Sequence, residues 1–276
     1  MSTPQGTNAY QQLWEDFGRN KSGSYVEYRY TPTHRVGLSN YLREQEVLRL
    51  VAPRKDDVIL DVGCAAGRQV FQLAPKVREA YGVDIAQSFV DSANNYKEAK
   101  GVRNTHFVAA PSETLPFPDA KFDVVICLEV LEHVFNKDTA LTELLRVLRP
   151  GGRLVISTPN LNSDGTFWGR FMRLLGKRSF TPIEVFKIEE LAAHGDAHVR
   201  EFTMRSMREW LTSAGLRVES VRTTSFIDGP YADPVLKFPL HVPPLKVLII
   251  WIEKALSATG LPYGRGLVAK ATKIGL

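Results

Sequence analysis

One acidic residue and two glycines share a short stretch, VILDVGCAAGRQV, at residues 58–70. An apolar run leads into Asp61, and Gly63 and Gly67 follow, four residues apart. Glycines at this spacing let the backbone turn sharply and approach a ligand without a Cβ in the way. A carboxylate beside the turn repels a pyrophosphate and attracts positive charge. The stretch predicts a site for a cationic small molecule, and a turn that serves packing alone is the alternative.

A second acid, Asp84, ends the next strand-like run, 23 residues after Asp61. A carboxylate at that point can accept hydrogen bonds from the hydroxyls of a ribose. Together the two acids favour S-adenosylmethionine, which carries a sulfonium, an ammonium and a ribose but no phosphate. An NAD-dependent oxidoreductase, an interpretation from a different class, is disfavoured by Asp61 and by the lack of a third glycine, because Ala65 stands at the middle position.

The stretch LEVLEHV supplies candidates for catalysis. Glu129, Glu132 and His133 fall at i, i+3 and i+4, so one helical turn would place them on a shared face. Two carboxylates and an imidazole can hold a divalent cation such as Mg²⁺, which would lower the pKa of an acceptor hydroxyl. In the alternative, the acids favour the positive end of a helix and His133 acts as a general base or pocket histidine. In both interpretations His133 is the candidate catalytic residue.

The elements that must position these residues alternate between strand-like and helix-like patterns. Strands are expected at 56–62, 77–85, 103–109, 121–129, 152–160, 216–226 and 264–274, and helices at 66–76, 86–100, 136–149, 203–214 and 244–258. Strands separated by helices of this length imply right-handed crossovers and a parallel sheet. The near-continuous apolar strands predict helices on both faces of that sheet.

Four motifs in this order resemble class I S-adenosylmethionine-dependent methyltransferases: LDVGCAAG, YGVDIA, ETLPFPDAKFDVVICLEVLEHV and LLRVLRPGGRLVISTPN. The branch with the ubiquinone-biosynthesis O-methyltransferases is the most similar. The likeness covers residues 45–160, with a weaker one over 196–221. It implies an α/β, Rossmann-like fold: a seven-stranded, mostly parallel sheet with helices on both faces and an antiparallel final strand. It also implies an enzyme that uses S-adenosylmethionine.

The resemblance implies roles for those residues of this chain that match the family's motifs by position. Pro111 departs from the family pattern, where an acid often contacts the adenine amine, and Ser112 is the candidate substitute. The Glu-Glu-His triplet also resembles the metal-binding set of RNA 3′-terminal 2′-O-methyltransferases, so an RNA 2′-O-methyltransferase is the same-fold alternative. The chain lacks the basic, aromatic-rich platform that single-stranded RNA binding uses, which makes nucleic acid an unlikely partner. The resulting cofactor-binding set is Asp61, Gly63, Gly67, Asp84, Ser112, Leu128 and Glu129, and the candidate metal set is Glu129, Glu132 and His133.

Four regions are expected along the chain: a cap or lid at 1–45, a cofactor-binding core at 46–160, an insertion at 161–200 over the acceptor site, and a C-terminal completion of the sheet at 201–276. Within the insertion, 167–178 predicts a basic amphipathic helix, which either closes the site as a lid or lies on an anionic membrane. Both readings favour an apolar or lipid-linked acceptor. His194, Asp196 and His198 could complete a site from this insertion, although surface positions are the more ordinary outcome.

Composition and charge limit which cellular locations and partners we expect for the protein. The net charge is +5, and its whole excess lies in residues 161–276, which hold 16 Lys and Arg against 11 Asp and Glu. The longest apolar run, VLIIWI at 247–252, is far shorter than the ~20 residues that a membrane span needs. The two cysteines lie in apolar runs and no secretory pattern opens the chain, so we expect a cytoplasmic protein, with 167–178 as a peripheral contact at the inner face of the membrane. The expected reaction is methyl transfer to an oxygen of a small molecule.

Overall fold

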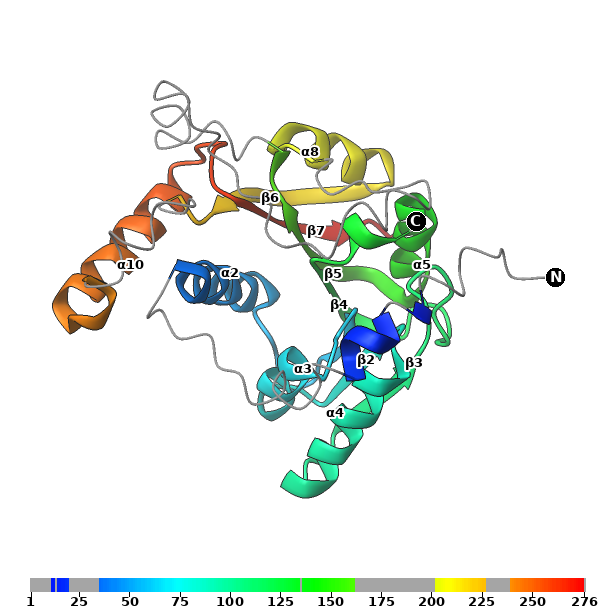
Figure 1. Cartoon of the computed structure of the whole chain (residues 1–276). Helices are drawn as coiled ribbons and strands as arrows, with labels where there is room; N and C mark the ends of the chain where they lie inside the picture. The colour runs from blue at the N-terminus through cyan, green and yellow to red at the C-terminus, as the bar shows by residue number, and fades with distance from the viewer. Residues whose placement is uncertain are drawn as a thin grey trace.

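A seven-stranded sheet in the order β3-β2-β1-β4-β5-β7-β6 organises the chain (Figure 1). The computed structural model describes residues 11–12, 14–19, 35–134, 136–161, 202–226 and 239–275. The predicted strands all form, within a few residues of the expected bounds. They are β1 (Val58–Val62), β2 (Glu79–Asp84), β3 (Thr105–Ala109), β4 (Phe122–Leu128), β5 (Leu148–Pro159), β6 (Leu216–Thr224) and β7 (Gly266–Lys273).

Strand direction follows the expected pattern. The strands β1 to β5 pair with one another in parallel, whereas β7 runs antiparallel to both β5 and β6. The prediction of a mostly parallel sheet with an antiparallel final strand is confirmed. The strand β5 begins at Leu148 instead of 152, because Leu148 already pairs with Phe122 before a shift of register along β4.

Helices cover both faces of the sheet. They are α2 (Arg35–Val51), α3 (Arg68–Leu73), α4 (Gln87–Lys100), α5 (Lys137–Val147), α8 (Met204–Ser213) and α10 (Pro243–Ala258). The expected N-cap of α5 is present, since the side chain of Asn136 accepts the backbone N–H groups of Asp138 and Thr139, both at 3.0 Å. Within the described residues, none of these helices has the length and hydropathy to cross a bilayer.

The core lies in two layers, one on each side of the sheet. On one side Leu144 of α5 and Met207 of α8 are fully buried against the sheet. On the other side Val47 of α2 and Leu73 of α3 are buried against it. All five residues of β1 are buried, which explains why its sequence is apolar except at Asp61.

The sheet order reverses between β1 and β4. From β1 the chain moves outward through β2 and β3, then returns to the other side of β1 with β4. Ligands of open α/β sheets bind at such a switch point, beyond the carboxyl ends of the strands. The turn after β1, the end of β2 and the end of β4 meet there, so the fold brings the predicted site residues to one edge.

Candidate active site

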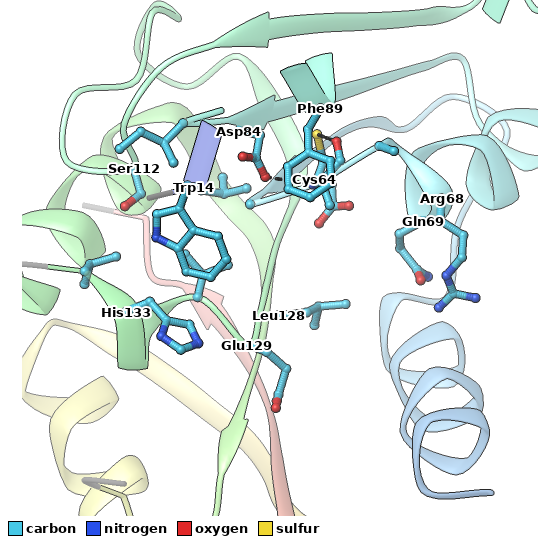
Figure 2. A pocket seen from close by; sticks show the side chains of 18 of the residues that line it. Trp14, Cys64, Arg68, Gln69, Asp84, Phe89, Ser112, Leu128, Glu129 and His133 are labelled. Atoms are coloured by element: carbon cyan, nitrogen blue, oxygen red, sulfur yellow. Dashed lines mark hydrogen bonds between the residues drawn. The ribbon is translucent and has the colours of Figure 1, made fainter. Parts of the chain in front are cut away.

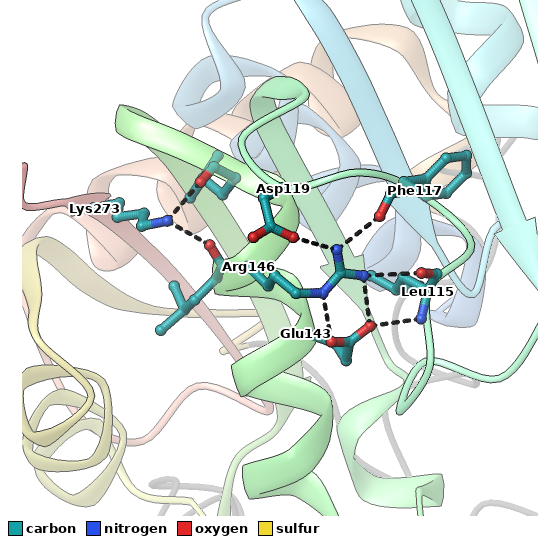
Figure 3. A network of polar contacts seen from close by, with 8 residues as sticks. Leu115, Phe117, Asp119, Glu143, Arg146 and Lys273 are labelled. Atoms are coloured by element: carbon teal, nitrogen blue, oxygen red, sulfur yellow. Dashed lines mark hydrogen bonds and ion pairs between the residues drawn. The ribbon is translucent and has the colours of Figure 1, made fainter.

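A cavity of about 410 Å³ lies at the switch point (Figure 2). This volume is within the range of small-molecule sites, about 300–1,000 Å³. Of the predicted cofactor residues, Asp61, Gly63, Asp84, Ser112, Leu128 and Glu129 line it and Gly67 does not, and side chains from the N-terminal part of the chain join them. Its lining comprises Trp14, Phe17, Arg43, Asp61, Val62, Gly63, Cys64, Ala65, Ala66, Arg68, Gln69, Asp84, Ile85, Phe89, Ala110, Ser112, Glu113, Leu128, Glu129, Val130, His133 and Val134.

The turn after β1 has a left-handed backbone at every second residue. Gly63 has φ 73°, Ala65 φ 45° and Gly67 φ 80°. A Cβ on Gly63 would overlap the side chain of Val130. Glycine is therefore needed here both for the left-handed conformation and for the close packing of the turn against Val130. Ala65 adopts the same left-handed region with a Cβ present. This explains why a glycine is usual at the middle position, and it shows that alanine adopts the required conformation with some strain.

Replacing Ala65 by glycine is expected to stabilise the fold. A left-handed residue with a Cβ costs roughly 1–2 kcal/mol, and glycine loses about 0.5–1 kcal/mol more in conformational entropy on folding. The net gain is therefore about 0.5–1 kcal/mol, seen as a higher midpoint of thermal unfolding. Ala120→Gly, at a second left-handed alanine (φ 54°) away from the cavity, is the matched comparison. A lower midpoint for Ala65→Gly alone would show that the packing of the methyl group against the cluster of Ala66, Ala86 and Phe89 contributes more to stability than the strain costs.

Asp84 fixes the turn as well as facing the cavity. Its two carboxylate oxygens accept the backbone N–H groups of Ala65 at 2.8 Å and of Ala86 at 3.0 Å. Burial raises the pKa of Asp84 to about 6, against the opposing effect of these backbone hydrogen bonds. Each carboxylate oxygen has two lone pairs, so the group can accept further hydrogen bonds from a ligand in the cavity.

Asp61 is the more strongly perturbed acid. It is 4% exposed at the end of β1 and lines the same cavity. Burial, and then repulsion from Asp84, raise the pKa of Asp61 to about 8, while Arg68 acts in the opposite direction. Two buried carboxylates in one cavity favour a ligand that brings positive charge, because such a ligand offsets both burial and repulsion.

Glu129 is held at the junction of three elements. It follows β4 with a left-handed φ of 55°, and its N–H donates to the carbonyl of Ser157 at 2.9 Å. Its carboxylate accepts the hydroxyl of Ser157 at 2.9 Å and pairs with the guanidinium of Arg43 on α2 at 3.0 Å. Arg43 thus brings a fixed cation next to a fixed anion at the cavity wall.

The structure does not support the predicted metal set. Glu129 lies outside any helix, and Glu132 and His133 belong to a 3₁₀ turn, Leu131–His133, so the α-helical spacing does not apply. Glu132 is absent from the cavity lining. Burial and the repulsion of Glu129 hold the pKa of Glu132 well above its ordinary value. In the part of the chain that the structure describes, no three His, Cys, Asp or Glu side chains are placed to hold a metal ion.

His133 does face the cavity. Its ring packs edge-to-face against the indole of Trp14, with ring centroids 5.3 Å apart (Figure 2). Burial lowers the pKa of His133, against the opposing charge of Glu129. The imidazole is therefore neutral near pH 7 and able to accept a proton.

The N-terminal helical residues within 11–19 form one wall of the cavity. Phe17 packs against Phe89 with centroids 5.9 Å apart, and Trp14 lies beside Phe17 and His133. The carboxylate of Glu15 accepts the backbone N–H groups of Gln87 at 2.5 Å and Ser88 at 3.1 Å. These contacts anchor the wall on the N-terminus of α4.

Sequence reasoning missed the contribution of this N-terminal part. Arg43 and Trp14 both line the cavity, yet neither lies in a periodic or motif-like stretch. The expectation of a cap at 1–45 was the available signal, without the particular residues. His194, Asp196, His198 and the stretch 167–178 lie outside the described residues.

Comparisons with known proteins agree with the fold. Residues 53–190 match the family model for a methyltransferase domain. An uncharacterised methyltransferase, YcgJ of Bacillus subtilis, is 35% identical over 103 residues, covering 37% of this chain and 41% of that protein. A ubiquinone biosynthesis O-methyltransferase of Rickettsia felis is 33% identical over 131 residues, covering 46% and 52%. The chain thus spans about half the length of the curated relatives it matches.

The solved structures show the same architecture. Geranyl diphosphate C-methyltransferase of Streptomyces coelicolor, in complex with Mg²⁺, a geranyl-S-thiolodiphosphate and S-adenosyl-L-homocysteine, superposes with a TM-score of 0.61 at 15% identity, covering 98% of this chain and 100% of that one. The family match covers half of the chain. The chain belongs to the methyltransferase domain family.

Proposed function

We propose that this enzyme moves the methyl group of S-adenosylmethionine to an oxygen of a small, apolar or lipid-linked molecule. The observation that carries the proposal is the cavity itself, which joins two buried acids, an arginine–glutamate pair and a neutral histidine. The relatives named as O-methyltransferases support oxygen as the acceptor atom. The aromatic wall of Trp14 and Phe17 supports an apolar acceptor.

The residues present fit the cofactor from one end to the other. Asp84 accepts the ribose hydroxyls with the lone pairs that its backbone hydrogen bonds leave available. Gly63 and Gly67 let the backbone of the turn approach the ligand, and Ser112 lies at the adenine end. Asp61 faces the positive charge of the cofactor.

The methionine end meets Leu128, Glu129 and Arg43. An amino acid carries an ammonium and a carboxylate side by side. The Arg43–Glu129 pair offers the complementary charges at the cavity wall, with the nitrogen and oxygen 3.0 Å apart. Ser157 holds the carboxylate of Glu129 from the other side, so its orientation is set before the ligand arrives. Such preorganisation lowers the entropic cost of binding.

In the reaction, the sulfonium supplies a methyl group that is already activated. The chain holds the acceptor oxygen in line with that methyl group, and His133 takes the acceptor proton as the carbon–oxygen bond forms. S-adenosylmethionine would leave as S-adenosylhomocysteine, with the electron pair of the broken sulfur–carbon bond on sulfur. Positioning supplies much of the rate, and proton removal matters because a hydroxyl is a poor nucleophile.

The N-terminal residues act as a cap over this site. The contacts of Glu15 with α4 and of Trp14 with His133 support the expected lid at 1–45, while α2 (Arg35–Val51) extends across the expected boundary of the core. We propose that the region 161–200 takes part in acceptor binding. We assign the completion of the sheet to the region 201–276. A contact of 167–178 with a membrane, and a cytoplasmic location, stay predictions from the sequence.

Calorimetric titration with S-adenosylmethionine and with NAD tests the proposed cofactor site. We expect binding of S-adenosylmethionine and none of NAD, because Asp61 faces the ligand. Methyl transfer from labelled cofactor to a panel of hydroxyl-bearing apolar acceptors then tests the proposed acceptor class. Binding of NAD alone would contradict the cofactor proposal, and transfer only to nitrogen or carbon acceptors would contradict the choice of oxygen.

The affinity for S-adenosylmethionine is expected to rise with pH. Asp61, with its pKa raised to about 8, must lose its proton to face a cation, so binding releases a proton at lower pH. The association constant should increase about tenfold per pH unit below that pKa. Titrations at pH 6 and 7 in two buffers with different ionisation enthalpies measure the released proton. Asp61→Asn should bind more weakly and lose this dependence; an equal dependence in the variant would contradict the role of Asp61.

A further inference from the structure

Two polar side chains, Arg68 and Gln69, line the cofactor cavity without a role in the function proposed above. They are the first two residues of α3, which begins directly after the turn that contains Gly63 and Gly67. Figure 2 places both side chains on the side of the cavity opposite His133. A ligand group bound there therefore belongs to the cofactor, because His133 is proposed to act on the acceptor.

Gln69 has a buried donor that lacks a partner. The residue is only 6% exposed, and its Nε2 atom has no hydrogen-bond partner among the residues that the structure describes. A buried donor that is left unsatisfied destabilises the fold. An amide nitrogen donates and does not accept, so the group that would satisfy it carries an acceptor oxygen. Gln69 thus points to an oxygen-bearing part of the ligand in this cavity.

Arg68 is fixed in place by an acid from another helix. Its Nη1 atom lies 2.5 Å from Oε1 of Glu44 on α2, and the side chain of Glu44 is 8% exposed. The helix α2 is itself anchored on the sheet, where Val47 is fully buried. Glu44 is not among the residues that line the cavity, so it holds the guanidinium from outside. The five N–H donors of a guanidinium can serve two carboxylates at once.

The charges around the cavity leave a place for one carboxylate of the ligand. Arg43 already pairs with Glu129 at 3.0 Å, and the positive charge of Arg68 lowers the pKa of Asp61. The methionine part of S-adenosylmethionine carries a carboxylate besides its ammonium. The buried acids of this cavity repel that carboxylate unless a cation faces it. Arg68 is the arginine of the lining whose partner acid lies outside the cavity.

We propose that Arg68 and Gln69 bind the carboxylate of the methionine part of the cofactor, and that Glu44 is the residue that positions Arg68. The inference rests on the proposed function, because it takes S-adenosylmethionine as the ligand. It extends that function to specificity: the chain selects adenosyl ligands that retain the carboxylate. The donors from α3 act in addition to Arg43 of α2, and their orientation is set before the ligand arrives, which lowers the entropic cost of binding.

Calorimetric titration with two ligands tests the role of Arg68. S-Adenosylhomocysteine carries the carboxylate, whereas S-adenosyl-3-thiopropylamine lacks it and keeps the adenosine, the sulfur and the ammonium. Arg68→Gln should weaken binding of S-adenosylhomocysteine roughly 10–100-fold and change binding of the decarboxylated ligand less than about threefold. Arg49→Gln is the matched control, at an arginine that pairs with Glu46 at 2.6 Å outside the cavity lining, and should bind both ligands as the unmodified chain does.

Gln69→Leu separates binding from stability. The variant should bind S-adenosylhomocysteine about tenfold more weakly, because a hydrogen bond to a charged group is lost. The thermal unfolding midpoint of the ligand-free protein should stay equal or rise, since the unsatisfied buried donor is gone. Gln72→Leu is the matched control: this residue of α3 also has a buried amide atom without a partner among the described residues, but it does not line the cavity. It should leave binding unchanged.

Glu44→Gln tests the positioning role. It should weaken binding of S-adenosylhomocysteine by about three- to tenfold and leave the decarboxylated ligand unaffected, because the change acts through Arg68. The double variant Glu44→Gln, Arg68→Gln should lose no more affinity than Arg68→Gln alone. A merely structural role of Glu44 would weaken both ligands equally and would add to the effect of Arg68→Gln.

The possible failures are distinguishable. If the unmodified chain does not bind S-adenosylhomocysteine, the proposed function is overturned and the inference with it. If it binds, and Arg68→Gln and Gln69→Leu leave the affinity unchanged or weaken both ligands equally, the inference alone is overturned. The thermal unfolding midpoint shows whether each variant is folded, without reliance on methyl transfer.

Discussion

Replacing His133 by glutamine is expected to lower the rate constant of methyl transfer by about 10²–10⁴-fold, the usual contribution of a general base. The imidazole lines the cavity beside Trp14, and burial lowers the pKa of His133, so it is neutral and can accept a proton at pH 7. Glutamine has a similar length and can hydrogen-bond, but it cannot take the proton. The measurement is the single-turnover rate with the acceptor that the hydroxyl panel identifies.

The affinity for S-adenosylhomocysteine should change little in this variant, because His133 acts on the acceptor. His106→Gln is the matched control: its imidazole is 43% exposed on β3, pairs with Glu79 at 2.6 Å and is remote from the cavity lining. The unmodified enzyme should also lose rate in acid as His133 becomes protonated, and the variant should not share that loss. An unchanged rate in His133→Gln would contradict the role of His133 as general base. Its packing against Trp14 would then be a structural contact.

Replacing Asp84 by alanine is expected to weaken S-adenosylhomocysteine binding by about 1–3 kcal/mol, or roughly 5–150-fold. The carboxylate is buried at the end of β2 and faces the cavity. Its removal takes away the proposed acceptor for the ribose hydroxyls. Calorimetric titration measures the loss, and Asp91→Ala, at an exposed acid on α4, is the matched control.

Asp84 also holds the backbone of Ala65 and Ala86, so the contact with ribose has to be separated from the support of the turn. A double-mutant cycle does this with a 2′,3′-dideoxy analogue of S-adenosylhomocysteine. If Asp84 binds the diol, the analogue should bind the unmodified enzyme and Asp84→Ala with similar affinity. If the analogue loses as much affinity as the parent ligand, Asp84 acts through the turn and the ribose role is wrong.

The order of strands and helices could be predicted because each element has a clear period and clear ends. Strand β1 is a run of apolar residues broken only by Asp61, and α5 begins after a capping asparagine. Parallel strands bring their carboxyl ends to one edge, so the meeting of Asp61, Asp84 and Glu129 followed from topology. The local sequence determines these features directly.

The rest of the site depends on contacts between distant segments. Arg43 reaches the cavity because α2 packs on the sheet, and Trp14 because Glu15 caps α4. Neither contact has a local pattern in the sequence. The metal prediction assumed an α-helix from Glu129 onward, whereas Glu129 adopts a left-handed conformation and a 3₁₀ turn follows. Spacing alone could not reveal that local change of geometry.

The two buried acids also affect how the protein should be handled without its ligand. Their pKa values are raised in the fold, to about 8 for Asp61 and about 6 for Asp84, above those of an unfolded chain. Folding therefore favours their protonated forms, and the stability that this protonation contributes is lost as pH rises through 6 and then 8. A cationic ligand offsets that loss. Ligand-free protein should keep longest in mildly acidic storage buffer, and a thermal-shift screen for cofactor analogues should be most sensitive in mildly alkaline buffer.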